Sequence, residues 1–255
     1  MNYFSATDIG LQRKLNEDYY DNYVDGDTIL MVVADGMGGH NAGEIASELA
    51  VKSFIYYFRE NLKDAEDMTK FLTDCVNYSN GIIYEESHND DELSNMGTTI
   101  VVALIHENYL YILNVGDSRA YFKNSFGFKQ VSRDHSLVND LLISGTITEE
   151  EAKNYGRKNV ITKSLGAELN VEPDITSLEI SEGDKVLLCS DGLNSLVSDG
   201  EIDEIISKEE KTEEERVFEL IDLSLSRGGY DNITISLYTH KEEDRWLVKL
   251  LEIDI

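Results

Sequence analysis

The sequence is poor in the residues that form covalent cross-links and rigid linkers. It has one proline, Pro173, and two cysteines, Cys75 and Cys189, far apart in its 255 residues. So few cysteines exclude a disulfide framework, and both lie in apolar patterns, so we expect buried structural thiols. No proline-rich linker, internal repeat or low-complexity segment divides the chain. Its length suits one large domain or two small ones.

Long apolar runs are also missing. The longest, residues 29–34 and 100–105, fall far short of the roughly 20 residues that a membrane helix needs. The N-terminal residues lack the basic segment and the apolar stretch of a signal peptide. We therefore expect a cytoplasmic protein without membrane contact.

Basic residues are scarce in comparison with acidic ones. The chain has 22 Lys and Arg against 50 Asp and Glu, which gives a formal charge of −28. Such a surface repels a phosphate backbone, so nucleic acid is excluded as a partner. Two interpretations of the remaining acid stay open. It forms a solvated, solubilising surface, or it attracts substrates and partners with basic flanks.

Apolar and β-branched runs joined by short turns predict antiparallel strands, because parallel strands need long crossovers. The clearest pair is 98–105 and 109–115, followed by 119–123 and 128–131. Helical spacing of apolar residues predicts helices over about 45–58, 71–83 and 201–227. Strands and helices in separate blocks indicate an α+β layered sandwich.

Residues 136–163 interrupt the strand pattern with a polar segment. Thr148 through Glu151 form a capping box that predicts the start of a short helix. We interpret this segment as a flap-like excursion over the sheet end, with a tolerated surface insertion as the alternative. The C-terminal tail 241–255 contains Trp246 and apolar neighbours, and is interpreted as a short helix docked on the body or on a partner.

Four aspartates lie next to apolar β-type runs. Asp35, Asp117 and Asp191 follow such runs, and Asp231 opens one. A rigid core holds residues at a sheet end, so several carboxylates there would form a set of hard oxygen ligands. Such ligands suit Mg²⁺ or Mn²⁺ better than zinc or copper. A pair of these ions can generate a nucleophile from water at neutral pH.

The glycine-rich loop after Asp35 invites comparison with a phosphate-binding P-loop. Gly38 and Gly43 have the right separation, but Glu44 and Ile45 stand where Lys and Ser or Thr are required. A glutamate there would repel phosphate, which excludes a nucleotide site of this kind. The glycines instead allow the backbone to approach a cation, with the carbonyl of Gly36 free to act as a ligand.

Motifs along the chain resemble those of metal-dependent protein serine/threonine phosphatases of the PPM (PP2C-like) family, especially compact bacterial members. The resemblance covers about residues 1–240, which would form one phosphatase domain. The segments that carry it occur in the family's order: Thr7-Asp8-Ile9-Gly10, Arg13 with Asn16-Glu17-Asp18, Ala34 through His40, Gly97-Thr98-Thr99, Gly116-Asp117-Ser118-Arg119, Asp134-His135-Ser136, Asn159 through Gly166, Ser190-Asp191-Gly192 and Asp231-Asn232-Ile233-Thr234.

The resemblance implies a four-layer α-β-β-α sandwich with a dinuclear Mn²⁺ or Mg²⁺ centre at one sheet end. Asp35 would bridge the two ions. The remaining ligands would be Asp191 and Asp231 for one ion, the Gly36 carbonyl and Glu17 for the other, and Asp117 with Asp191 for a weaker third ion.

The resemblance also implies that Arg13 clamps the substrate phosphate, for which its planar fork is suited. From the residues alone, a surface salt bridge with Glu17, four residues on, is the favoured interpretation of Arg13. Where some family members have a histidine after Asp-Gly, this chain has Met37, so the leaving-group acid is open between His40 and a water on a metal ion.

The implied activity is hydrolysis of phosphoserine and phosphothreonine in proteins by a monomer that opposes a eukaryotic-type Ser/Thr kinase. Two alternatives remain. One is a regulatory phosphatase dedicated to a single partner, and the other is a non-catalytic pseudophosphatase that binds phosphoprotein.

Overall fold

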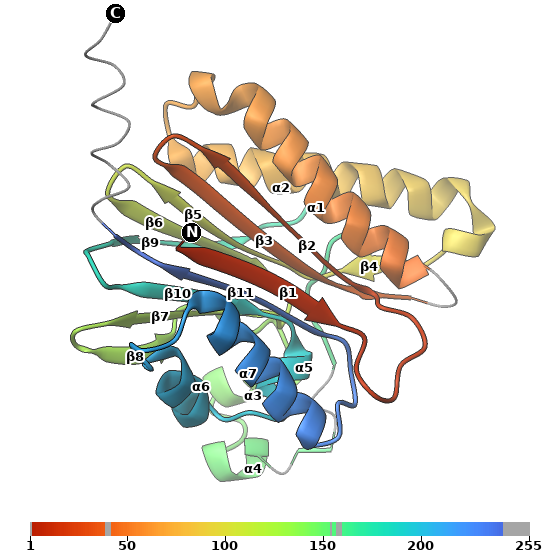
Figure 1. Cartoon of the computed structure of the whole chain (residues 1–255). Coiled ribbons are helices and arrows are strands. Elements are labelled where there is room, and N and C mark those ends of the chain that lie inside the picture. Colours follow the sequence, from red (N-terminus) through yellow and green to blue (C-terminus); the bar gives the residue numbers. More distant parts are fainter. Residues whose placement is uncertain (1, 39–41, 154, 157–159, 242–255) are drawn as a thin grey trace, which may run out of the picture.

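The computed structural model describes residues 2–38, 42–153, 155–156 and 160–241. Two antiparallel sheets lie face to face in the middle, and helices cover both outer faces (Figure 1). This four-layer arrangement confirms the predicted α+β sandwich. Among the described helices, none is both long and apolar enough to cross a membrane.

The first sheet has the order β1-β11-β10-β7-β8. Strands far apart in sequence are therefore neighbours: β11 lies between the first strand and β10. The bounds are β1 (Tyr3–Asp8), β7 (Arg119–Asn124), β8 (Gly127–Gln130), β10 (Lys185–Cys189) and β11 (Ile233–Thr239).

The second sheet has the order β2-β3-β5-β6-β9, with the short β4 paired to the end of β3. The predicted hairpin appears here as β5 and β6. The bounds are β2 (Asp18–Asp25), β3 (Thr28–Met37), β4 (Gly97–Thr98), β5 (Ile100–His106), β6 (Tyr109–Val115) and β9 (Asp174–Glu179).

The central strands are buried on both faces, which explains their nearly continuous apolar runs. Along β3, Leu30 and Val32 face the helix layer, while Met31 and Val33 face the other sheet. Burial of each such side chain stabilises the fold by about 1.5–3 kcal/mol. These central strands form the rigid support on which the sheet end is built.

Two long helices cover the second sheet, and shorter helices cover the first (Figure 1). Cys75 and Cys189 are buried free thiols, as predicted. The bounds are α1 (Ala42–Asn61), η1 (Leu62–Asp64), α2 (Met68–Asn89), η2 (Asp91–Leu93), α3 (Leu137–Ile143), α4 (Glu149–Lys153), α5 (Asp191–Asn194), α6 (Asp199–Ile206) and α7 (Glu213–Ser226).

The predicted single helix over 201–227 is wrong, because α6 and α7 are separate. Thr212 caps α7, accepting a hydrogen bond from the Glu215 N–H and donating to its carboxylate. Arg216 then bonds the Lys208 carbonyl at 2.8 and 3.1 Å, which fixes the connection between the helices. The sequence pattern does not show this break between the helices, because charged residues continue at helical spacing.

The segment 136–163 begins and ends at one point, where Ser136 and Ile161 form an isolated antiparallel bridge. It contains α3 and α4, and the predicted capping box is present. The Thr148 N–H donates to the Glu151 carboxylate at 2.8 Å, and the Glu151 N–H donates back to the Thr148 hydroxyl at 3.2 Å. Of the tail 241–255, all but Lys241 lies outside the described residues.

Candidate metal centre

The predicted acids meet at one end of the two sheets, the end toward which β1 runs (Figure 1). Asp117 lies in the turn between β6 and β7, Asp191 is the first residue of α5, directly after β10, and Asp231 immediately precedes the short turn into β11. Asp35 differs slightly from its prediction. It lies within β3, because Gly36 and Met37 continue the strand by pairing with β4.

The charges of these acids are close enough to disturb one another. Although part of the Asp35 side chain reaches solvent, burial raises its pKa well above the usual value, and Asp18, Asp191, Asp117 and Asp231 raise it further. Burial, followed by the repulsion of Asp117, Asp231 and Asp18, raises the pKa of Asp191 to about 7. The site therefore concentrates negative charge that a cation would balance.

Asp117 faces a second group of charges. Burial raises its pKa to about 6, with a further contribution from Asp134. Asp117, Asp191 and Asp231 all line a cavity of about 550 Å³. These three carboxylates thus open onto one space that a substrate could enter.

Gly36 brings the backbone into the site. A Cβ at this position would lie 2.0 Å from the Gly43 carbonyl oxygen and 2.6 Å from the Glu17 carbonyl oxygen. The Gly36 N–H donates to the Glu17 carbonyl at 2.9 Å. Glu17 is thereby held against both glycines, with its side chain 16% exposed. Only glycine allows this close approach.

Arg13 reaches into the acid cluster from the loop between β1 and β2. Its guanidinium donates to Asp231 at 2.8 Å and to Glu17 at 3.4 Å. The sequence alone suggested only the local pair with Glu17. The shorter contact is to a residue 218 positions away, so Arg13 belongs to the site.

The donor set fits a divalent cation of the hard type. Carboxylates and a backbone carbonyl are the ligands that Mg²⁺ and Mn²⁺ prefer, and the mutual repulsion above is the cost that such an ion would remove. Among the described residues, no three His, Cys, Asp or Glu side chains lie close enough together to hold an ion as they stand. One of the acids, Asp231, is instead paired with Arg13 at 2.8 Å.

Two residues of the centre were not predicted as site residues. Asp18 pairs in register with Asp35, is 6% exposed and accepts a hydrogen bond from the Ser190 hydroxyl at 2.6 Å. Burial raises its pKa to about 6. Asn232 accepts from the Glu17 N–H at 2.8 Å and so fixes that loop. Asp18 is the first residue of the edge strand β2, which has no apolar run to mark it in the sequence, and this is why Asp18 was missed.

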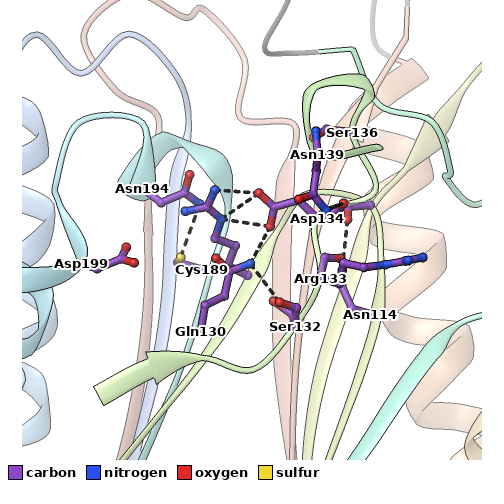
Figure 2. A network of polar contacts seen from close by, with 12 residues as sticks. Asn114, Gln130, Ser132, Arg133, Asp134, Ser136, Asn139, Cys189, Asn194 and Asp199 are labelled. Carbon is purple, nitrogen blue, oxygen red and sulfur yellow. Dashed lines mark hydrogen bonds and ion pairs between the residues drawn. The ribbon is translucent and has the colours of Figure 1, made fainter. Parts of the chain in front are cut away.

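One wall of the cavity is an ordered polar network (Figure 2). Asp134 accepts from both Nε and Nη2 of Arg119, at 2.6–3.0 Å, and from Gln130 at 2.7 Å. Asn139 at the base of the 136–163 segment donates to the Asp134 carbonyl at 2.7 Å. The network joins β7 to this segment and fixes a charge beside Asp117.

His135 is a buried, hydrogen-bonded residue. The ring Nδ1 of His135 accepts a hydrogen bond from the Gly116 N–H at 3.1 Å, and the backbone N–H of His135 donates to the Gly116 carbonyl at 2.9 Å. Its Nε2 lies 3.3 Å from an Asp174 oxygen. These contacts fix the turn that carries Asp117. His40 lies outside the described residues.

Comparison with known proteins gives a consistent result. A family model described as protein phosphatase 2C matches residues 12–252. The serine/threonine phosphatase stp of Listeria monocytogenes serotype 4b is 39% identical over 234 residues, which cover 91% of this chain and 92% of that protein.

Solved structures agree in fold as well as in sequence. The crystal structure of a bacterial serine phosphatase has a TM-score of 0.87 and 37% identity, covering 94% of this chain and 98% of that one. The catalytic domain of the phosphatase PstP in complex with two manganese ions has a TM-score of 0.80 and 35% identity, and the match covers 93% of this chain and 96% of that one.

Proposed function

The chain belongs to the protein phosphatase 2C family of serine/threonine phosphatases, and we propose that it removes phosphate from phosphoserine and phosphothreonine in proteins with the help of two Mn²⁺ or Mg²⁺ ions. The observation that carries this proposal is the meeting of Asp35, Asp191 and Asp231 at one sheet end, with Arg13 beside them. Like-charged groups gathered this closely are costly in a folded protein unless they serve a bound cation.

Within this proposal, each acid has a place. Asp35 would be a ligand of both ions, Asp191 and Asp231 would hold one of them, and the Gly36 carbonyl and Glu17 would hold the other. Asp117 and Asp191 hold a weaker third ion. When bound, the ions lower the pKa of water toward neutrality and absorb charge on the phosphoryl oxygens.

Arg13 binds the phosphate of the substrate. Its guanidinium offers two parallel N–H donors, a match to phosphate oxygens that the point charge of lysine lacks. In the structure these donors are engaged by Asp231 and Glu17. With the charge of the acids balanced, the attraction that holds Arg13 on Asp231 and Glu17 would be weaker, and its donors would be available to the phosphate.

The surroundings of the centre complete the proposal. Residues 1–240 form one phosphatase domain, and residues 136–163 form a flap beside the cavity. Support for the flap comes from its base, where Asn139 bonds Asp134 on the cavity wall. Phosphoproteins made by a eukaryotic-type Ser/Thr kinase are the proposed substrates.

The test measures phosphate release from para-nitrophenyl phosphate and from phosphothreonine peptides of unrelated sequence. Protein treated with EDTA is assayed with and without Mn²⁺, beside Asp35→Asn and the matched surface variant Asp222→Asn on α7. We expect Mn²⁺-dependent release that Asp35→Asn abolishes and Asp222→Asn retains. Folded wild-type protein without metal-stimulated release contradicts the proposal. Turnover of only one peptide among many would assign the enzyme to a single dedicated partner.

A further inference from the structure

Four large apolar side chains stand exposed on two neighbouring loops, one of which carries Arg13. Ile9, Leu11 and Leu15 belong to the loop between β1 and β2, and Tyr230 lies between α7 and β11. Their exposed fractions are 39%, 64%, 42% and 62%. We call these four side chains the apolar rim.

The two loops are fixed to one another, so the rim is an ordered feature. The Leu11 N–H donates to the Gly229 carbonyl at 2.8 Å. Asn232 donates to the carbonyls of Ile9 at 2.9 Å and Leu15 at 3.0 Å. Figure 1 shows the loop after β1 beside the segment that leads into β11. Such backbone anchors keep the side chains at the surface, where collapse would otherwise bury them.

Tyr230 is restrained from its other side. Gly228 has a φ of +121°, and a Cβ on it would lie 2.5 Å from the Tyr230 ring. Tyr230 precedes Asp231 and lines the same 550 Å³ cavity as Asp191. A rigid aromatic ring with little conformational entropy to lose is a favourable contact for a ligand that enters this cavity.

The rim adjoins Arg13: Leu11 and Leu15 are each two residues from it along the chain, and Tyr230 precedes Asp231, which Arg13 contacts at 2.8 Å. An extended chain advances about 3.3–3.6 Å per residue, so the two residues on either side of the phosphoresidue lie over the surface next to Arg13. Covering exposed apolar side chains beside a binding site with apolar atoms of a ligand stabilises the complex. A polar or charged residue of the ligand placed there would lose its hydration without such a gain.

We propose that the apolar rim selects phosphoprotein segments that carry a bulky apolar residue within two positions of the phosphoserine or phosphothreonine. The inference rests on the proposed phosphatase function and adds a substrate preference to it. Position supports this occupant: the rim adjoins Arg13, so residues next to a phosphoresidue bound by Arg13 would lie over it.

The experiment compares phosphothreonine peptides of equal net charge that carry leucine or serine at each of the two positions before and after the phosphoresidue. The value of kcat/KM is measured for each peptide with wild-type protein, Leu11→Ser and Tyr230→Ser. The matched control is Phe126→Ser. Phe126 is 96% exposed in the turn between β7 and β8, at the opposite end of the sheet.

At one or more positions, wild-type protein and Phe126→Ser should prefer leucine by about tenfold, and the rim variants should reduce this ratio to below about threefold. Because each ratio is measured within one enzyme, a general loss of activity cannot mimic the effect. Thermal unfolding checks that the variants fold. Two rim variants are used, so that the test still stands if one of them fails to fold.

The inference is overturned if the wild-type protein shows no leucine preference, or if both folded rim variants keep it. Dimeric wild-type protein that becomes monomeric in Leu11→Ser, with peptide preference unchanged, would assign the rim to a second copy of the chain and also overturn it. Failure of the proposed function has a different signature, because para-nitrophenyl phosphate would then show no Mn²⁺-stimulated turnover.

Discussion

Raising the pH should lower the free energy of unfolding of the metal-free protein. The substitution Asp191→Asn should remove much of this pH-dependent loss of stability. In the folded chain the pKa of Asp191 is raised from 3.8 to about 7. Between these values the folded state holds a proton that the unfolded state has released. The free energy of unfolding therefore falls as pH rises from about 4 to about 7.

The size of the effect follows from the shift. Each unit of pKa difference corresponds to about 1.36 kcal/mol, so Asp191 alone would account for about 4 kcal/mol. Its carboxylate opens onto the cavity, and solvent screening reduces the expected loss to about 2–3 kcal/mol. At pH 7.5 without metal, Asp191→Asn should therefore unfold about 4–12 °C above wild-type protein.

The assay is thermal and urea unfolding in EDTA at pH 5.5 and 7.5. Asp222→Asn serves as the control, because it removes one acid of this highly acidic chain from an exposed position of α7. Added Mn²⁺ should stabilise the wild-type protein at pH 7.5, and it should stabilise Asp191→Asn by a smaller amount. If metal-free Asp191→Asn at pH 7.5 is no more stable than Asp222→Asn, burial and the neighbouring acids do not destabilise the Asp191 carboxylate as argued.

Three further substitutions test separate parts of the centre. Arg13→Ala should raise KM for phosphothreonine peptides by about 10–100-fold, the cost of a charged hydrogen bond, while calorimetry shows a smaller change in Mn²⁺ affinity; an unchanged KM would exclude the phosphate clamp. Gly36→Ala should lower the free energy of unfolding by about 1–3 kcal/mol, because its Cβ meets the Gly43 carbonyl oxygen at 2.0 Å; unaltered urea unfolding would contradict the packing described. His135→Asn keeps an acceptor near the Nδ1 position and His135→Gln does not, so the glutamine variant should be less stable by about 1–3 kcal/mol, the cost of an unpaired Gly116 N–H; equal urea midpoints would refute this role.

Much of the fold could be predicted because its central strands carry a strong local signal. The hairpin of β5 and β6 and the two long helices were visible as apolar patterns. The edge strands β1, β2 and β9 were not, because their side chains are mostly half-buried or exposed and form no apolar run. Pairing with a buried neighbour, which sequence periodicity does not record, makes these segments strands.

The same limit applies to the site. Asp35, Asp117, Asp191 and Asp231 could be predicted from their positions beside apolar runs, and the structure brings them within electrostatic reach. Asp18 could not, since it has no apolar run beside it and its hydrogen-bond partner, the Ser190 hydroxyl, lies 172 residues away. Contacts of this kind form only when the two sheets are stacked.

The most direct test of the account is a crystal of the protein soaked in Mn²⁺, with the ions located by anomalous scattering. We predict two neighbouring ions, both within bonding distance of the Asp35 carboxylate, with Asp191 and Asp231 on one of them and Arg13 released from Asp231. Manganese absent from this sheet end, or bound there without contact to Asp35, would contradict the central claim.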